Sequence, residues 1–80
     1  MAISYRIRVD KRIHAALHGE LQPLSMQVRA ILQHLVLFPE KGSQQLAPGA
    51  YRVIANHLKV LYTLDHSNKA VTVYWLGKTM

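Results

Sequence analysis

The sequence predicts one α+β domain of two layers over residues 1–80, with the order strand, helix, helix and then three strands in one sheet. Apolar and polar residues alternate near the N-terminus, as in a half-buried strand. Two later segments carry apolar residues at helical spacing, and the last thirty residues contain three runs rich in Val, Leu, Tyr and Thr. These three patterns together predict a β-α-α-β-β-β order whose last three strands form an antiparallel meander.

The N-terminal strand is predicted from a period of two. Its apolar residues are Ile3, Tyr5, Ile7 and Val9. Arg6 and Arg8 occupy the alternate positions, so we expect both to point away from the core. Asp10 follows where a helix N-cap belongs, because a short side-chain oxygen can accept from the free amides of the first turn.

Two helices are predicted next. The first carries Ile13, Ala16, Leu17 and Leu21 at helical spacing and ends at the break around Pro23. The second is expected to begin near Ser25 as its cap and to end at Pro39. Its apolar stripe consists of Val28, Ile31, Leu32, Leu35 and Phe38. Both stripes are available to cover one face of the sheet.

A loop and the meander complete the chain. Residues 40–49 contain two Gly, a Pro and polar residues, so we expect a loop of about ten residues. The three strands follow in the segments 49–55, 57–65 and 70–78, joined by Asn56-His57 and by residues 66–69. Regular alternation turns either Tyr74 or Trp75 outwards, but it also leaves Ile54, Leu61 and Leu76 on the outer face. The last strand therefore has a reversed register, or the outer face is partly covered.

Composition limits the classes of function. The chain has ten Lys and Arg against four acids, a formal net charge of +6 and a sequence pI near 10.1, which favours a polyanionic partner such as nucleic acid. It has no cysteine, which excludes disulfides, thiolate metal sites and a cysteine nucleophile. No apolar run reaches the ~18 residues of a membrane span and no secretion signal is evident, so we expect a cytoplasmic protein.

The order of elements and several segments resemble the RelE/ParE superfamily of bacterial toxin–antitoxin toxins. The resemblance runs through Val28–Leu35 and Phe38-Pro39, Leu46–Val53, Lys59–Asp65 and Val71–Lys78. It implies a toxin that is neutralised by an antitoxin protein wrapped around its surface. RelE-like members cleave mRNA in the ribosome, whereas ParE-like members act on DNA gyrase.

The resemblance also implies a catalytic site of cations. In RelE-like cleavage the ribose 2′-OH attacks the adjacent phosphate, so cations stabilise the developing charge and another group moves protons. Arg52 and Lys59 match basic positions of the family, and Lys78 takes the place of an expected Arg without its bidentate fork. A further basic position of the family is Ile54 here. His57 is the histidine that we expect to transfer a proton.

The chain departs from the ribonuclease members at its C-terminal end. Those members continue into a segment with a catalytic Tyr, whereas this chain ends at Met80. Under the resemblance, Tyr74, Tyr62 or His57 would have to supply the missing proton transfer. Whether the chain is a metal-independent endoribonuclease is therefore left open.

Other residues have both a functional and an ordinary interpretation. Arg6, Arg8, Lys11 and Arg12 form the densest basic stretch, which fits contacts with RNA phosphates but also ordinary solubility. Either Tyr74 or Trp75, whichever points outwards, is a candidate for stacking on a base or for contacting the antitoxin. Arg52 and Lys59 fit catalysis, antitoxin contacts or solvated strand charges. His14 and His18 lie four residues apart on the first helix, but without a third ligand we expect a solvated face and no metal.

Three functional hypotheses follow. The first is a RelE-like toxin that inhibits translation by ribosome-dependent mRNA cleavage, with the antitoxin, the ribosome and mRNA as partners. The second is a protein of the same fold that is not a nuclease, either ParE-like or only binding an antitoxin. The third is a small basic nucleic-acid-binding protein. None of the three requires a cofactor or a membrane.

Overall fold

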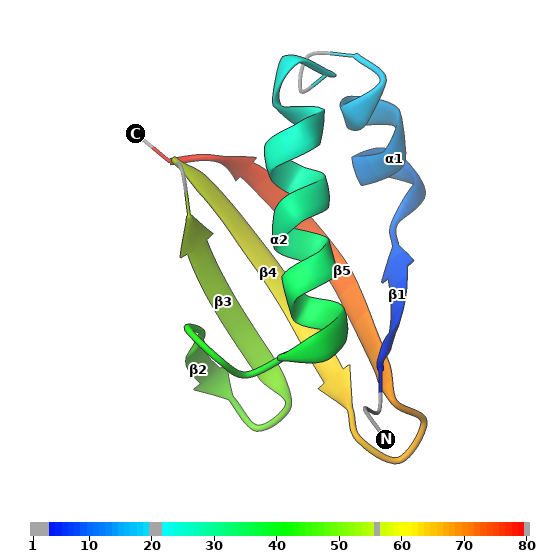
Figure 1. Cartoon of the computed structure of the whole chain (residues 1–80), viewed down its shortest axis with the longest axis vertical. Helices are drawn as coiled ribbons and strands as arrows, with labels where there is room; N and C mark the ends of the chain where they lie inside the picture. The colour runs from blue at the N-terminus through cyan, green and yellow to red at the C-terminus, as the bar shows by residue number, and fades with distance from the viewer. Residues whose placement is uncertain (1–3, 20–21, 56, 80) are drawn as a thin grey trace.

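The computed structural model describes residues 4–19, 22–55 and 57–79. The elements are β1 (Arg6–Val9), α1 (Lys11–Leu17), a short 3-10 helix η1 (Gln22–Leu24), α2 (Ser25–Leu37), β2 (Gln44–Ala47), β3 (Ala50–Ala55), β4 (Leu58–Asp65) and β5 (Ala70–Lys78). The strands form one sheet, and α2 lies across one of its faces while α1 flanks the β1 side (Figure 1). The α+β class and the two-layer arrangement agree with the prediction.

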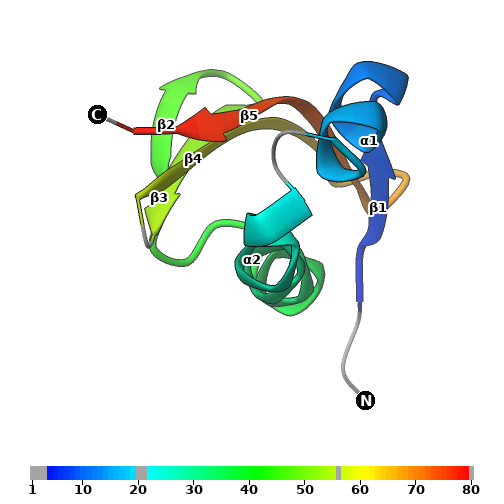
Figure 2. The same ribbon diagram turned by 90° about the horizontal axis from the view of Figure 1, so that it is seen from above.

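The sheet has five strands in the order β1-β5-β4-β3-β2. β1 runs parallel to β5, and the other neighbouring pairs are antiparallel. The predicted meander is therefore present as β3, β4 and β5, and the N-terminal strand closes the sheet on the far side of β5. Figure 2 shows the twist of this sheet above α2.

The prediction of a single loop over residues 40–49 was wrong, because Gln44–Ala47 forms β2 at the edge of the sheet. All four residues of β2 are exposed and none is β-branched or aromatic, so the segment lacks the usual strand signal. A tight turn at Pro48-Gly49 brings β2 onto β3. Gly49 has φ +80°, which fits the third position of a type II turn after proline.

The helix ends differ in part from the prediction. Asp10 is the N-cap of α1, as expected, and its Oδ1 accepts from the Arg12 amide at 2.7 Å. α1 ends at Leu17, well before Pro23, while Leu21 and Ile3 lie outside the described residues. Ser25 begins α2 but is not its cap. Leu24 holds that position without a side-chain hydrogen bond, because η1 leads directly into the helix.

The core lies between α2 and the sheet. Its buried side chains are Ile13, Val28, Ile31, Leu35, Val53, Leu58, Val60, Tyr62, Leu64, Val71, Val73 and Leu76. Tyr62 is the largest of those that are fully buried, and the half-buried Tyr51 stacks on it with ring centroids 5.8 Å apart. Among the described residues, no helix is long and apolar enough to cross a membrane.

The register of β5 resolves the conflict that the sequence left open. Leu61 pairs with Trp75, but the next residue, Tyr62, pairs with Val73, so Tyr74 is an extra residue in a β-bulge. Leu76 is buried as a result, whereas Ile54 stays exposed. Regular alternation predicted that only one of Tyr74 and Trp75 points outwards, and this was wrong because the bulge exposes both.

Candidate functional site

The face of the sheet opposite α2 is called the open face. Cross-strand pairing places on it the residues Arg8, Gln44, Arg52, Ile54, Lys59, Leu61, Thr63, Thr72, Trp75 and Gly77. None of these residues is buried, whereas their neighbours along each strand supply most of the core. The alternation of each strand thus separates a packed face from a face that is free to meet a ligand.

Arg52 and Lys59 bring two cations to adjacent strands of the open face. Arg52 lies in β3 opposite Leu61, and its guanidinium donates to the side-chain oxygen of Gln44 in β2. Lys59 lies in β4 opposite Ile54 and Gly77. Both side chains are partly exposed, so an anion can reach them from solvent.

Trp75 occupies the open face between these cations and β1. Its indole lies over Gly77, since a Cβ atom at residue 77 would come within 2.6 Å of the Cη2 atom of the ring. The Lys59 ammonium lies 5.2 Å from the ring centroid, a distance at which a cation is attracted to the ring face. The backbone of Gly77 and the side chain of Lys59 therefore hold the position of the indole.

The described carboxylates have partners elsewhere. Asp10 caps α1, and Asp65 accepts from the backbone and the side chain of Asn68, which lowers the pKa of Asp65. Glu40 lies 3.1 Å from His66 Nε2 and accepts from the Tyr51 hydroxyl. Arg52 and Lys59 thus have no carboxylate partner within the described part of the chain, and Asp65 lies at the other end of β4, opposite Ala70.

The four residues predicted to be catalytic do not lie together. Arg52 and Lys59 share the open face, but Lys78 pairs in register with the buried Leu58 and so belongs to the helix side of the sheet. His57 occupies the β3–β4 turn with φ +65°. Lys78 and His57 together line a hollow of about 540 Å³, whose other lining residues are Leu24, Gln27 and Thr79.

The predicted RNA-binding residues are all exposed. Arg8 lies on the open face opposite Thr72, and Arg6 pairs with Ala70 at the same edge of the sheet. Lys11 and Arg12 belong to the first turn of α1. Tyr74 lies beside Trp75 and is 46% exposed. Arg6 and Arg8 therefore add positive charge across the sheet from Arg52.

The five histidines do not gather with other described side chains into a metal-ligating cluster. The rings of His14 and His18 lie 4.9 Å apart on α1, as their spacing predicts. No group of three or more His, Cys, Asp or Glu side chains that could hold a metal ion occurs within residues 4–19, 22–55 and 57–79. The two imidazoles alone do not make the four-ligand set that a structural zinc requires.

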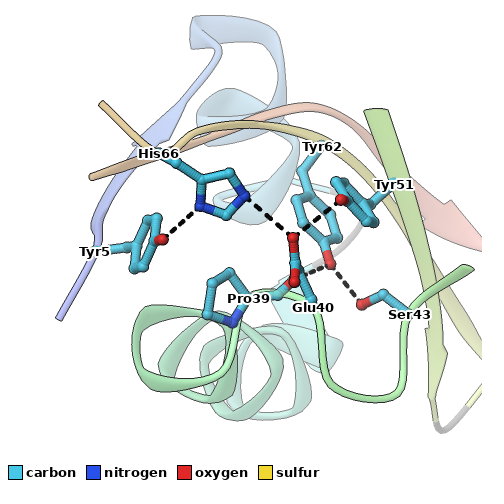
Figure 3. A network of polar contacts seen from close by, with 7 residues as sticks. All are labelled: Tyr5, Pro39, Glu40, Ser43, Tyr51, Tyr62 and His66. Atoms are coloured by element: carbon cyan, nitrogen blue, oxygen red, sulfur yellow. Dashed lines mark hydrogen bonds and ion pairs between the residues drawn. The ribbon is translucent and has the colours of Figure 1, made fainter. Parts of the chain in front are cut away.

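A polar network closes the end of the core near the C-terminus of α2 (Figure 3). The Tyr5 hydroxyl lies 2.6 Å from His66 Nδ1, and Tyr51 donates to Glu40, which His66 also contacts. The hydrogen bond to Glu40 raises the pKa of Tyr51. The network joins Tyr5, just before β1, to β3, the β4–β5 turn and the segment after α2, and it lies on the helix side of the sheet.

The hydroxyl of Tyr62 belongs to the same network. It donates to the carbonyl oxygen of Pro39 and lies 2.5 Å from the hydroxyl of Ser43. Burial raises the pKa of Tyr62, so its phenol keeps its proton at neutral pH. The structure therefore places this residue, one of the sequence candidates for proton transfer, away from Arg52 and Lys59 and on the opposite side of the sheet.

Comparison with known proteins identifies the fold. No protein-family model matches the chain, and no curated protein matches it in sequence. Among solved structures, it is similar to the toxin–antitoxin complex RelBE2 from Mycobacterium tuberculosis, with a TM-score of 0.75 and 18% identity over 95% of this chain and 99% of that one. The chain has the fold of the RelE toxins.

Further structures with the RelE fold agree with this result. A mutant of the Escherichia coli toxin RelE in the free state has a TM-score of 0.75 and 18% identity, over 94% of this chain and 83% of that one. The archaeal RelE–RelB complex from Pyrococcus horikoshii has a TM-score of 0.61 and 19% identity over 94% of each chain. The RelE fold expected from the sequence is thereby confirmed.

Sequence reasoning missed two residues of this site. From the sequence, Trp75 is expected to point outwards only as an alternative to Tyr74. The packing of its indole over Gly77 is not predicted. The sequence alone carried no signal for either, because Val71, Val73 and Trp75 continue a regular period of two. Only the burial of Leu76, three residues after the buried Val73, reveals the bulge.

Proposed function

We propose that the protein is a RelE-like toxin whose open face binds the phosphates of mRNA in the ribosome and promotes its cleavage. The observation that carries this proposal is the placement of Arg52 and Lys59 side by side on an open, partly aromatic sheet face with no described carboxylate beside them. The similar solved structures include RelE toxins and RelE–RelB complexes, which supports the same choice.

The proposed chemistry is transesterification without a metal ion. The 2′-oxygen forms a bond to phosphorus while the bond from phosphorus to the 5′-oxygen breaks, and the proton lost by the 2′-OH is balanced by one gained by the leaving oxygen. Negative charge accumulates on the phosphate in the transition state. Arg52 can offer two parallel donors to such a group, and Lys59 supplies a mobile point charge.

The proposed partner that controls the toxin is an antitoxin protein. One of the similar structures is the E. coli RelE toxin in complex with a peptide of the antitoxin RelB, with a TM-score of 0.75 and 19% identity over all of this chain. A net charge of +6 favours an acidic antitoxin segment. A ribosomal target also places the protein in the cytoplasm.

A reconstituted translation reaction tests the proposal. Purified protein is added to translating ribosomes, and the 5′ ends of the mRNA are mapped by primer extension. We expect cuts that require ribosomes and that disappear in Arg52→Ala/Lys59→Ala. The matched control is Arg29→Ala/Lys41→Ala, which removes two exposed cations from α2 and the segment after it. Intact mRNA at saturating wild-type protein contradicts the nuclease activity and favours the non-nuclease alternative.

Lys78 and His57 are tested separately, because they line a different hollow. If Lys78→Ala and His57→Ala cut mRNA at the wild-type rate, the reaction uses the open face alone. If either variant is as slow as the Arg52→Ala/Lys59→Ala variant, the hollow takes part and the phosphate must reach both sides of β5. The two results distinguish a reaction confined to the open face from one that also uses the hollow.

A further inference from the structure

The bulge in β5 places the indole of Trp75 on the open face. Tyr74 is the extra residue of the bulge, so Tyr74 and Trp75 both point out between the buried Val73 and Leu76. Bulges often re-aim a side chain next to a functional site. Trp75 is 41% exposed, so part of the ring is open to solvent.

The support of the indole is specific. Gly77 does not adopt a left-handed conformation, so backbone freedom does not explain the glycine. Space does, because a methyl group there would meet three ring carbons at 2.6, 3.0 and 3.2 Å. Lys59, opposite Gly77, holds its ammonium 5.2 Å from the ring centroid. Gly77 supports one side of the indole, and the long Lys59 side chain can move aside. A flat ligand can therefore stack on the ring.

The surroundings of the ring carry positive charge. Trp75, Leu61 and Arg52 follow one another in register across three strands, so about 10 Å separates the backbones of Trp75 and Arg52. Lys59 lies beside this row. A nucleotide whose base lies on the indole can therefore extend its phosphate toward Lys59 and Arg52. An apolar protein segment would offer no anion to either of these cations.

We propose that Trp75 is a stacking platform for one unpaired base of the RNA, with Lys59 moving from the ring to the phosphate beside that base. The inference rests on the proposed function, since it names the part of the RNA that this face recognises. Stacking on an aromatic ring is tolerant of base identity. The platform therefore fixes the position of a nucleotide and does not select its sequence.

The sole tryptophan of the chain reports directly on this contact. Its fluorescence is measured during titration with a single-stranded RNA hexanucleotide and with the same hexanucleotide carrying abasic sites, which keep the phosphates. We expect saturable quenching by the first RNA only. Equal quenching by both, or none by either while RNA binds, overturns the stacking proposal.

Substitutions provide the second measurement, the anisotropy of a fluorescein-labelled hexanucleotide. Trp75→Leu is expected to weaken binding about 5- to 150-fold, and Trp75→Phe by less because it keeps a smaller ring. Gly77→Ala keeps the tryptophan but displaces it, so it should weaken binding in the same direction. Met26→Ser removes an exposed apolar side chain of α2, outside the open face, and should bind RNA as the wild type does. Thermal melts check that each variant is folded.

The outcomes separate the two proposals. RNA binding that depends on Arg52 and Lys59 but not on Trp75 overturns the platform and leaves the proposed function standing. If both Trp75→Leu and Ile54→Ser lose the binding of an antitoxin peptide but keep the binding of RNA, the stacking platform is also overturned. The surface around Trp75 is then a protein interface. Absence of both RNA binding and mRNA cleavage in the wild type overturns both proposals.

Discussion

The salt dependence of RNA binding gives the sharpest test of the charge on the open face. Arg52 and Lys59 each carry one positive charge that no described carboxylate offsets. If each contacts one phosphate, each releases condensed counterions when single-stranded RNA binds, and the slope of log K against log salt changes by about 0.7 per contact. The Arg52→Ala/Lys59→Ala variant should therefore have a slope shallower by about 1.4.

The slope converts into a measurable ratio. Between 50 and 200 mM salt the concentration rises fourfold, so a slope difference of about 1.4 changes the ratio of wild-type to variant affinity about sevenfold. Anisotropy titrations of a labelled RNA hexanucleotide at 50, 100 and 200 mM salt measure this ratio. Trp75→Leu should lose affinity at every salt concentration without a change of slope, because stacking releases no counterions.

The matched control is again Arg29→Ala/Lys41→Ala, which lowers the net charge equally but removes no cation of the open face. Exposed charges farther away than the Debye length, about 10 Å at 0.1 M salt, contribute little. The reasoning is refuted if the Arg52→Ala/Lys59→Ala line is parallel to that of the wild type, or if the control changes the slope as much.

Three predictions concern the frame that supports the site. Leu35→Ala removes a fully buried side chain of α2 and should lower the free energy of unfolding by about 2–5 kcal/mol in urea denaturation. The pKa of Tyr62 is raised above its usual value of 10.0, so the stability that its protonated form provides is complete below pH 10 and is lost as pH rises further. Tyr62→Phe should therefore lose less stability than the wild type between pH 9 and pH 11, as measured by urea midpoints. Deletion of Tyr74 should remove the bulge and leave the emission of Trp75 that of a partly exposed indole, whereas a shift to buried emission would contradict the register.

The parts of the fold that could be predicted are those where burial and periodicity agree. The stripe of α2 and the three long strands follow this rule, and so does the Asp10 cap, whose chemistry is local. β2 could not be predicted, because its exposed residues have no apolar pattern and its pairing depends on the Pro48-Gly49 turn and on the presence of β3. The start of α2 was placed correctly, but its cap was not, because η1 occupies the preceding turn.

The candidate site was predictable only in its cations. Arg52 and Lys59 stand at alternate positions of their strands, so parity alone puts them on one face. Lys78 has the right charge, but the bulge shifts the parity of β5 by one residue and turns its position to the helix side. Such a shift is a tertiary feature, since it shows only when the residues of β5 are paired with those of β4.

The extra residue explains why an aromatic pair can sit on this face without disturbing the core. If Tyr74 were absent, the three residues Val73, Trp75 and Leu76 would point inward, outward and inward in turn. This is the order that the core requires. The added residue thus lies outside the packed layer, and the inward-pointing side chains of β5 keep their places in the core. What it changes is the open face, where it adds a second aromatic side chain next to Trp75 and the local twist that a bulge brings. A sheet selected only for stability has no use for an extra residue at this point, and its presence beside Arg52 and Lys59 fits a surface shaped for a ligand.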